Sequence, residues 1–212
     1  MTSTKLSKLF ITGCDSHTEW MLPWFVETFK KHNDIPLMIM DFGMEGSWYP
    51  EMRKSVRTTD KGWFKKPRAM EIASAFADQV CWLDTDCEVL GDISDIFSYI
   101  KPQKLSMVID QPWSDRRGGT WHNSGVVAYQ GIPQVLKDWT EWCAHTPIQG
   151  DQETLHVMLD SPLKRMINIE DLPNKYNVLR IQHIDKTVPP DPLVYHWTGQ
   201  KGKDHIRKLI NG

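Results

Sequence analysis

The chain has 212 residues, of which 40% are hydrophobic and 25% charged, a composition typical of globular proteins. Lys and Arg total 25 and Asp and Glu total 27, so the net charge is −2, and without a basic surplus we expect no binding to nucleic acid or to an anionic membrane. No apolar run reaches the length of a membrane span, and we expect residues 1–212 to form a single domain with a full core.

The cysteines are scattered along the chain without Cys-x-x-Cys spacing. This pattern favours reduced thiols and predicts a cytoplasmic location. Residues 1–5 carry no apolar signal core, so we also expect no membrane anchor of the kind that Golgi enzymes have. The four cysteines are Cys14, Cys81, Cys87 and Cys143.

The first forty residues predict a strand, a helix and a second strand. Residues 8–13 are an apolar run that stops at a glycine, and residues 35–41 form a second run of this kind. Between them, Ser16–Glu19 has capping-box spacing and precedes an apolar stripe at helical spacing. The unit is a parallel crossover. Its first corner, Gly13-Cys14-Asp15, lies where a nucleotide base or ribose often binds, and a plain turn is equally compatible.

A polar stretch at residues 44–62, which we expect to be irregular, precedes a predicted helix over Ala69–Ala77. The helix is opened by Lys65-Lys66-Pro67-Arg68, and proline suits the first helical position. In one interpretation these cations meet a phosphate or a sugar. In the other they form a solvated basic cluster, and we weigh the two about equally.

The central feature of the chain is a buried strand that stops at two carboxylates. Val80–Leu83 is an apolar run, and Asp84 and Asp86 follow it one residue apart. Ligands of open α/β sheets bind outside the carboxyl ends of the strands, which places both carboxylates at the rim of a crevice. Close carboxylates repel each other, and a hard divalent cation relieves the repulsion. A surface turn is the alternative for this triplet alone.

The remaining elements alternate between strands and helices, with no repeat or linker. We therefore predict an α/β fold with a mixed, mainly parallel central sheet. The tail is expected to be irregular and proline-rich up to its last strand. The predicted elements are a short helix over 94–99, a strand over 106–110, a mobile loop over 111–120, a strand over 126–129, helices beginning near Val135 and Asp151, and strands over 166–169 and 193–197.

Five motifs in one order resemble glycosyltransferases of the GT-A fold, in particular family 8, the glycogenin and bacterial galactosyltransferase type. The resemblance extends from about Lys65 to Lys203 and implies a single, Rossmann-like nucleotide-diphospho-sugar transferase domain. The motifs are Cys81-Trp82-Leu83-Asp84-Thr85-Asp86, Asn123-Ser124-Gly125-Val126, Gly150-Asp151-Gln152-Glu153, Leu172-Pro173-Asn174-Lys175-Tyr176-Asn177 and His196-Trp197-Thr198-Gly199-Gln200-Lys201.

The resemblance implies a role for each motif. Asp84 and Asp86, with His196 as third ligand, would hold Mn²⁺ or Mg²⁺ against the donor diphosphate. Asp151 and Gln152 would be the reactive pair beside the donor sugar. The predicted donor-binding set comprises Gly13 and Asp15 at the nucleoside, Lys66 and Arg68 at the helix start, Asn123 and Gly125 along the sugar, and Gly199 and Lys201 toward the diphosphate.

The chain departs from the family in its closing motif, which usually reads His-x-x-Gly-x-x-Lys-Pro-Trp. Gly202 stands in the usual place of the lysine, and Pro-Trp is missing. The phosphate-contacting lysine is therefore either Lys201 or Lys203. The chain is also shorter than typical members, so we expect its acceptor-binding elements to be reduced or supplied by a partner.

The predicted activity is metal-dependent transfer of a hexose from a nucleoside-diphosphate sugar, a UDP-sugar, to a hydroxyl of a saccharide, lipid or protein, with retention at the anomeric carbon. An inverting transferase is the first alternative, with Asp151 or Asp110 as base. A non-catalytic nucleotide-sugar binding protein is the second. A sugar nucleotidyltransferase is the third, although the corner at Gly13 lacks the glycine-rich phosphate loop expected of one.

Overall fold

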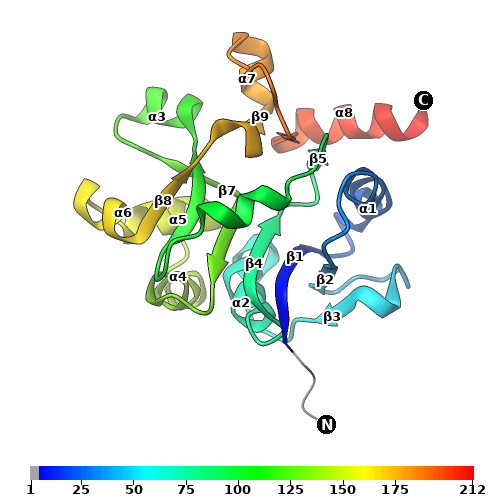
Figure 1. The fold of residues 1–212 in the computed structure, drawn as a ribbon, viewed down its shortest axis with the longest axis horizontal. Coiled ribbons are helices and arrows are strands. Elements are labelled where there is room, and N and C mark those ends of the chain that lie inside the picture. Colours follow the sequence, from blue (N-terminus) through cyan, green and yellow to red (C-terminus); the bar gives the residue numbers. More distant parts are fainter. Residues whose placement is uncertain (1–4) are drawn as a thin grey trace.

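The computed structural model describes residues 5–212 and is built on a seven-stranded, mainly parallel sheet with the strand order β3-β2-β1-β4-β7-β6-β8 (Figure 1). Strands β3, β2, β1 and β4 run parallel, β7 is antiparallel to both of its neighbours, and β8 is parallel to β6. The predicted α/β fold class is thus confirmed. The strands are β1 (Leu6–Cys14), β2 (Leu37–Asp41), β3 (Arg53–Ser55), β4 (Ala77–Leu83), β6 (Leu105–Ile109), β7 (His122–Gln130) and β8 (Ile169–Leu172).

Helices cover both faces of this sheet because alternate residues of its strands point to opposite sides. On β1, Leu9 and Ile11 join the core beneath α2 (Lys66–Ala73), α4 (Gln134–His145) and α5 (Asp151–Met158). Phe10, between them, joins the opposite core with α1 (Leu22–Lys30) and the 3₁₀ helix Ser94–Tyr99. The predicted apolar stripe of α1 is buried there, as expected of an amphipathic helix.

A second, three-stranded sheet joins the middle of the chain to its end. β10 (Val194–His196) lies between β5 (Cys87–Val89), which is antiparallel to it, and β9 (Val178–Leu179), which is parallel. The pairing sets His196 opposite Cys87, the residue that directly follows Asp86 in the sequence. The chain then continues into α8 (Gly199–Asn211), which ends at the C-terminus (Figure 1). Ile206 of α8 packs against Met21 and Trp197.

Two predicted elements are wrong in type. Residues 111–120, expected to be a loop, contain α3 (Gln111–Arg117), whose N-cap Asp110 accepts a hydrogen bond from the Trp113 N–H. The strand expected at 166–169 is instead the end of α6 (Pro162–Asn168), capped by Ser161, and β8 begins at Ile169. In both cases a capping side chain and a proline in the first turn start a short helix.

Other boundaries also differ from the prediction. The capping box at Ser16–Glu19 does not form, because the Ser16 N–H donates to Gly43 O and the Glu19 N–H to Asp15 O, and a 3₁₀ helix, Glu19–Met21, precedes α1. The helix predicted over Ala69–Ala77 ends at Ala73, and Ala77 opens β4. Further elements absent from the prediction are β3, β5, the 3₁₀ helices Pro50–Met52, Gly62–Lys65 and Asn174–Tyr176, β9, α7 (Arg180–Asp185) and α8.

All four cysteines are free and buried. Among residues 5–212, none of the helices combines the length and the apolar composition that crossing a membrane requires.

Candidate functional site

A cavity of about 990 Å³ opens where β1 and β4 end and β7 begins. Most of the residues predicted for the site line it, although they come from elements far apart in the sequence. Arg68, Gly125 and Lys201 are not among its lining residues. The predicted residues in the lining are Gly13, Asp15, Lys66, Asp84, Asp86, Asn123, Asp151, Gln152, His196 and Gly199.

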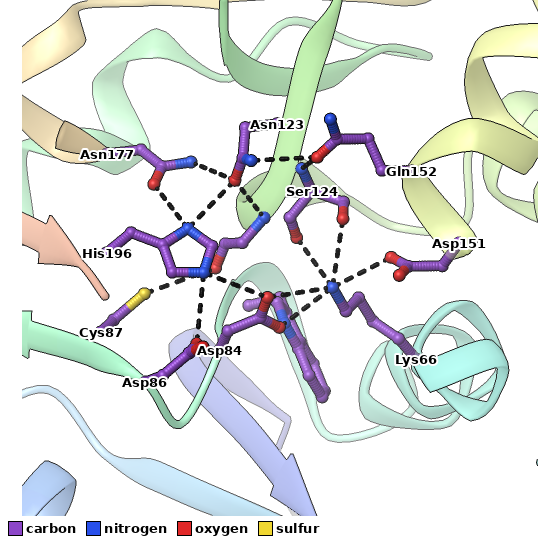
Figure 2. Close-up of polar contacts among 12 residues, drawn as sticks. Lys66, Asp84, Asp86, Cys87, Asn123, Ser124, Asp151, Gln152, Asn177 and His196 are labelled. Carbon is purple, nitrogen blue, oxygen red and sulfur yellow. Dashed lines mark hydrogen bonds and ion pairs between the residues drawn. The ribbon is translucent and has the colours of Figure 1, made fainter. Parts of the chain in front are cut away.

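His196 meets the two aspartates at the floor of this cavity (Figure 2). Its Nε2 lies 3.2 Å from Asp86 Oδ1 and 3.7 Å from Asp84 Oδ2. Burial alone would lower the pKa of His196, but the two carboxylates outweigh it and hold the pKa above its ordinary value. For Asp86 the signs are reversed. Burial alone would raise its pKa, but His196 outweighs burial and holds the pKa below its ordinary value. A protonated His196 would thus offset part of the negative charge of the two carboxylates.

The donor set fits a divalent cation. Two carboxylates and one imidazole suit Mn²⁺ or Mg²⁺, and such an ion would require the neutral form of His196. Cys87 Sγ also lies close, within 4.8 Å of ligand atoms of Asp86 and His196. Its thiol, however, donates to Gly125 O, and burial together with the nearby aspartates raises the pKa of Cys87 well above its usual range. Oxygen and imidazole nitrogen are the better donors here.

Lys66 brings a buried ammonium to the other side of Asp84. Its Nζ lies 3.0 Å from Asp84 Oδ1 and 3.0 Å from Asp151 Oδ2, and it also donates to the carbonyl and hydroxyl oxygens of Ser124. Burial acts to lower the pKa of Lys66, but Asp151 and Asp84 reverse this and raise it. Lys66 stands in the first turn of α2 and Asp151 in the first turn of α5, so two helix starts converge on Asp84.

Gln152 is held by a network of amides and one carboxylate. Its Oε1 accepts from Asn123 Nδ2 at 2.9 Å and from Ser124 N at 3.3 Å, and its Nε2 donates to Asp110 Oδ2 at 3.1 Å. Asp110 Oδ2 also accepts from Asn123 Nδ2. The Gln152 side chain therefore has one defined orientation at the cavity wall.

Gly125 and Arg68, two of the predicted residues that do not line the cavity, contact other parts of the protein instead. Gly125 lies against the imidazole of His196, and a Cβ at this position would overlap the ring. Arg68 forms ion pairs with Glu71 and Glu141 on the outer side of α2.

The closing motif places Lys203, not Lys201, at the cavity. Lys201 is exposed on α8, whereas Gly202 is buried so close to the backbone of Trp197 that any Cβ would overlap Trp197 O. A lysine at position 202 could not occupy this place. The departure from the family motif thus has a packing reason.

Asn177 is a residue that sequence reasoning missed as part of the site. Its side chain lies between Asn123 and His196, with hydrogen bonds to both (Figure 2). The asparagine stood within a motif quoted above, but nothing in the spacing showed that it would contact His196. The pairing of β9 with β10 creates this contact.

Comparison with solved structures identifies the fold. The apo form of the glycosyltransferase GlyE from Streptococcus pneumoniae TIGR4 superposes with a TM-score of 0.65 at 18% identity, over 92% of this chain and 55% of that one. An active-site mutant of LgtC gives 0.62 at 12% identity, covering 96% and 95%. The chain has the GT-A fold.

A third solved structure has a similar fold. It is a glycosyltransferase involved in glycosylation of the major capsid of PBCV-1, with a TM-score of 0.64 at 13% identity, covering 95% of this chain and 99% of that one. This chain spans only 55% of the GlyE structure, so GlyE has a further part without a counterpart here. No protein-family model matches the chain, and no curated protein matches it significantly. At these identities the likeness shows the fold alone.

Proposed function

We propose that this protein is a metal-dependent glycosyltransferase of the family 8 type, which moves a hexose from a UDP-sugar to a hydroxyl acceptor with retention. The observation that carries the proposal is the meeting of Asp84, Asp86 and His196 in one cavity with Asp151 and Gln152. This arrangement occurs on a fold that glycosyltransferases share. Its cavity, about 990 Å³, is at the upper end of the range for small-molecule sites and has room for a donor and part of an acceptor.

Asp84, Asp86 and His196 would hold the cation. A bound Mn²⁺ or Mg²⁺ would neutralise the departing diphosphate and orient it. Lys203 extends from α8 to the same cavity and would pair with a phosphate, while Lys201 points elsewhere in this arrangement. Gly13 and Asp15 line the end of β1 and would contact the nucleoside. The donor would thus be held at its base and at its diphosphate.

On the sugar side, the chain supplies fixed polar groups. Gln152 is oriented by Asn123 and Asp110, and Asp151 by Lys66. These groups would bind the hydroxyls of the donor sugar and fix its anomeric carbon toward the acceptor. Because each is already hydrogen-bonded or ion-paired, little reorganisation is needed when the sugar binds.

Retention is favoured over inversion because the two candidate bases, Asp151 and Asp110, are already engaged by other groups. An inverting transferase needs a carboxylate free to take the acceptor proton. Asp151 is paired with Lys66, and Asp110 accepts hydrogen bonds from both Asn123 and Gln152. The acceptor belongs to the class of saccharide, lipid or protein hydroxyls. A cytoplasmic location is part of the proposal, supported by the four free thiols.

A donor screen tests the proposal. Nucleoside-diphosphate sugars are added with Mn²⁺, the shift of the unfolding temperature is recorded, and release of UDP is followed with varied acceptors. We expect a UDP-sugar to stabilise the protein only with metal and to be turned over, with a product anomer that NMR identifies as retained. Donor binding without any turnover would instead support the non-catalytic binding protein.

Two carboxamide variants locate the metal role. Asp84→Asn and Asp86→Asn should each lower Mn²⁺-dependent donor binding at least tenfold while the chain stays folded, because the carboxamide fills the same space and Lys66 keeps Asp151 as its ion-pair partner. Asp138→Asn, on the exposed surface of α4, is the matched control. Isothermal titration of UDP with Mn²⁺ gives the affinities. Full activity of either site variant at low metal would show that the aspartates do not bind it.

A further inference from the structure

One backbone group determines the hydrogen-bond directions around His196. The N–H of Gly125 can only donate, and it lies 2.9 Å from Asn123 Oδ1. The other end of the same amide lies 3.2 Å from Asp110 Oδ2, which as a carboxylate oxygen accepts. The Asn123 amide therefore has its oxygen toward Gly125 and its nitrogen toward Asp110. A flip would set two acceptors together at one end and two donors together at the other.

This orientation fixes the next amide in turn. The Asn177 side-chain atom that lies 2.8 Å from Asn123 Oδ1 must be a donor, so it is Nδ2. Asn177 Oδ1 then faces His196 Nδ1 at 3.0 Å, and Asn123 Oδ1 lies 3.1 Å from the same ring nitrogen (Figure 2). Two amide oxygens around Nδ1 require that Nδ1 carries a hydrogen.

We propose that Asn177 is a positioning residue that, together with Asn123, holds the neutral His196 ring as the Nδ1–H tautomer and so leaves the Nε2 lone pair for a divalent cation. The proposal rests on the metal-dependent function proposed above and names the residue that prepares its histidine. Without Asn177, Asn123 Oδ1 alone would compete for the ring proton with the carboxylate of Asp86, 3.2 Å from Nε2, and a proton on Nε2 would block the lone pair.

Burial makes the arrangement effective. Asn177 is 1% exposed, His196 4% and Asn123 6%, so bulk water cannot replace the Asn177 oxygen. The ring cannot turn freely, because it packs against Gly125. Asn177 immediately precedes β9, whose parallel register with β10 pairs Leu179 with His196. The asparagine is thereby held beside the strand that carries the histidine.

Metal affinity is the first test. Mn²⁺ binding in the presence of UDP is measured by calorimetry for the parent, for Asn177→Leu and for Asn177→Asp. We expect Asn177→Leu to bind about 10–100-fold more weakly, as for other lost partners of ligating histidines. Asn177→Asp should bind Mn²⁺ more tightly than Asn177→Leu, because its carboxylate still accepts from Nδ1–H although it loses the donor to Asn123 Oδ1. The matched control is Asn33→Leu, which removes another buried asparagine, one that donates to Phe29 O and accepts from Ile93 N.

The tautomer is the second test and needs no metal. Nitrogen-15 NMR of histidine-labelled, metal-free protein at alkaline pH, where the ring is neutral, distinguishes the two ring nitrogens. We expect hydrogen on Nδ1 in the parent and in Asn177→Asp, and a shift toward Nε2–H in Asn177→Leu. The parent spectrum and Asn177→Asp decide the matter if Asn177→Leu fails to fold.

The outcomes separate the two proposals. Hydrogen on Nε2 in the parent, or Asn177→Leu with unchanged tautomer and unchanged Mn²⁺ affinity, would overturn the role of Asn177. Equal loss of Mn²⁺ affinity in Asn33→Leu would also overturn it, since the effect would then follow stability alone. A parent that shows Nδ1–H but binds no Mn²⁺ would overturn the proposed metal-dependent function and the metal part of this inference, and would leave the hydrogen-bond assignment standing.

Discussion

Lys66 places a fixed positive charge among carboxylates that have no other lysine or arginine partner in the described chain. Its side chain is 4% exposed, so the ammonium has exchanged water for Asp84, Asp151 and Ser124. An internal charge of this kind contributes little net stability while its partners are present. Removing it alone is different, because it leaves Asp84 and Asp151 without the cation that both contact.

We therefore predict that Lys66→Met lowers the free energy of unfolding by about 3 kcal/mol, the range found when one partner of a buried ion pair is removed. Urea unfolding of the metal-free protein measures the change. Lys137→Met, at an exposed position of α4, is the control and should change stability by less than about 0.5 kcal/mol. Equal stability of the two variants would show that the ion pairs at Lys66 are not required for the fold.

At this scale, the sequence indicated the acidic pair, the histidine and several neighbours such as Lys66 and Asn123, but not every group that contacts them. Asp84 and Asp86 follow directly from a strand that stops at two carboxylates, whereas His196 as third ligand was implied only by the family resemblance. Asn177 and Lys203 could not be predicted in the same way. The first depends on strand register and the second on the rotation of α8 about its axis, and both are tertiary properties.

The C-terminal helix α8 depends on one residue without a side chain. Gly202 lies against the backbone of Trp197, whose indole N–H donates to Glu88 at 2.8 Å, so the carbonyl that a Cβ would strike is held in place. We predict that Gly202→Ala displaces the start of α8, costs about 1–3 kcal/mol of stability and weakens UDP binding by moving Lys203. Urea unfolding and UDP titration measure both effects.

Lys201→Ala is the control for that substitution, since Lys201 is exposed on the same turn of α8. It should leave stability and UDP affinity close to the parent values. If Lys201→Ala weakens UDP binding and Gly202→Ala does not, the phosphate-contacting lysine is Lys201, as the family resemblance first implied.

Two glycine-bearing segments border the cavity and are candidates for ordering over the diphosphate. Gly118 and Gly119 have φ values of 72° and 78° and follow Arg116, which lines the cavity. Gly199, with φ of 71°, opens α8 ahead of Lys203. We predict slower amide hydrogen exchange in 116–119, 199–203 or both when UDP and Mn²⁺ are added. The helix α4 serves as internal reference, and unchanged exchange in both segments would exclude a lid.

Strands and helices with a long periodic pattern of apolar residues could be predicted from the sequence. Short helices marked only by an N-cap residue could not. The apolar runs of β1, β2 and β4 and the stripes of α1 and α4 each bury a face and leave a periodic pattern. α3 and α6 have no buried residue, so no stripe marks them. Their signals are single caps, Asp110 and Ser161, followed by proline. Such a signal is easily read as a turn.

Stability of the whole molecule should depend on pH through His156. Its ring stacks on Trp121 at 3.4 Å between centroids, and Arg165 Nη2 lies 3.2 Å from its Nε2. Burial, with Arg165 and His122 nearby, lowers the pKa of His156 to about 4. In the unfolded chain the pKa of His156 is about 6.5, so as the pH falls the unfolded state binds the proton before the folded state does. The contribution of neutral His156 is therefore complete above about pH 6.5 and declines toward pH 4.

We predict that the parent loses more stability than His156→Phe between about pH 6.5 and pH 4. The difference should be about 1 kcal/mol, since solvent screens this partly exposed ring. Urea unfolding at several pH values measures it, and taking the difference removes contributions from His122 and the carboxylates. His145→Phe, at an exposed position, is the control. Parallel pH profiles of the parent and His156→Phe would contradict the prediction.

The position of β10 has a consequence for how the protein is made. Asp84 and Asp86 leave the ribosome more than a hundred residues before His196, roughly 6–20 s earlier at synthesis rates of about 5–20 residues per second. Lys66 precedes them and can neutralise Asp84 during that interval. A nascent chain can thus assemble β1 to β4 around an internal counter-charge. It should acquire tight cation binding only when β10 pairs with β5, so translation itself determines when the site matures.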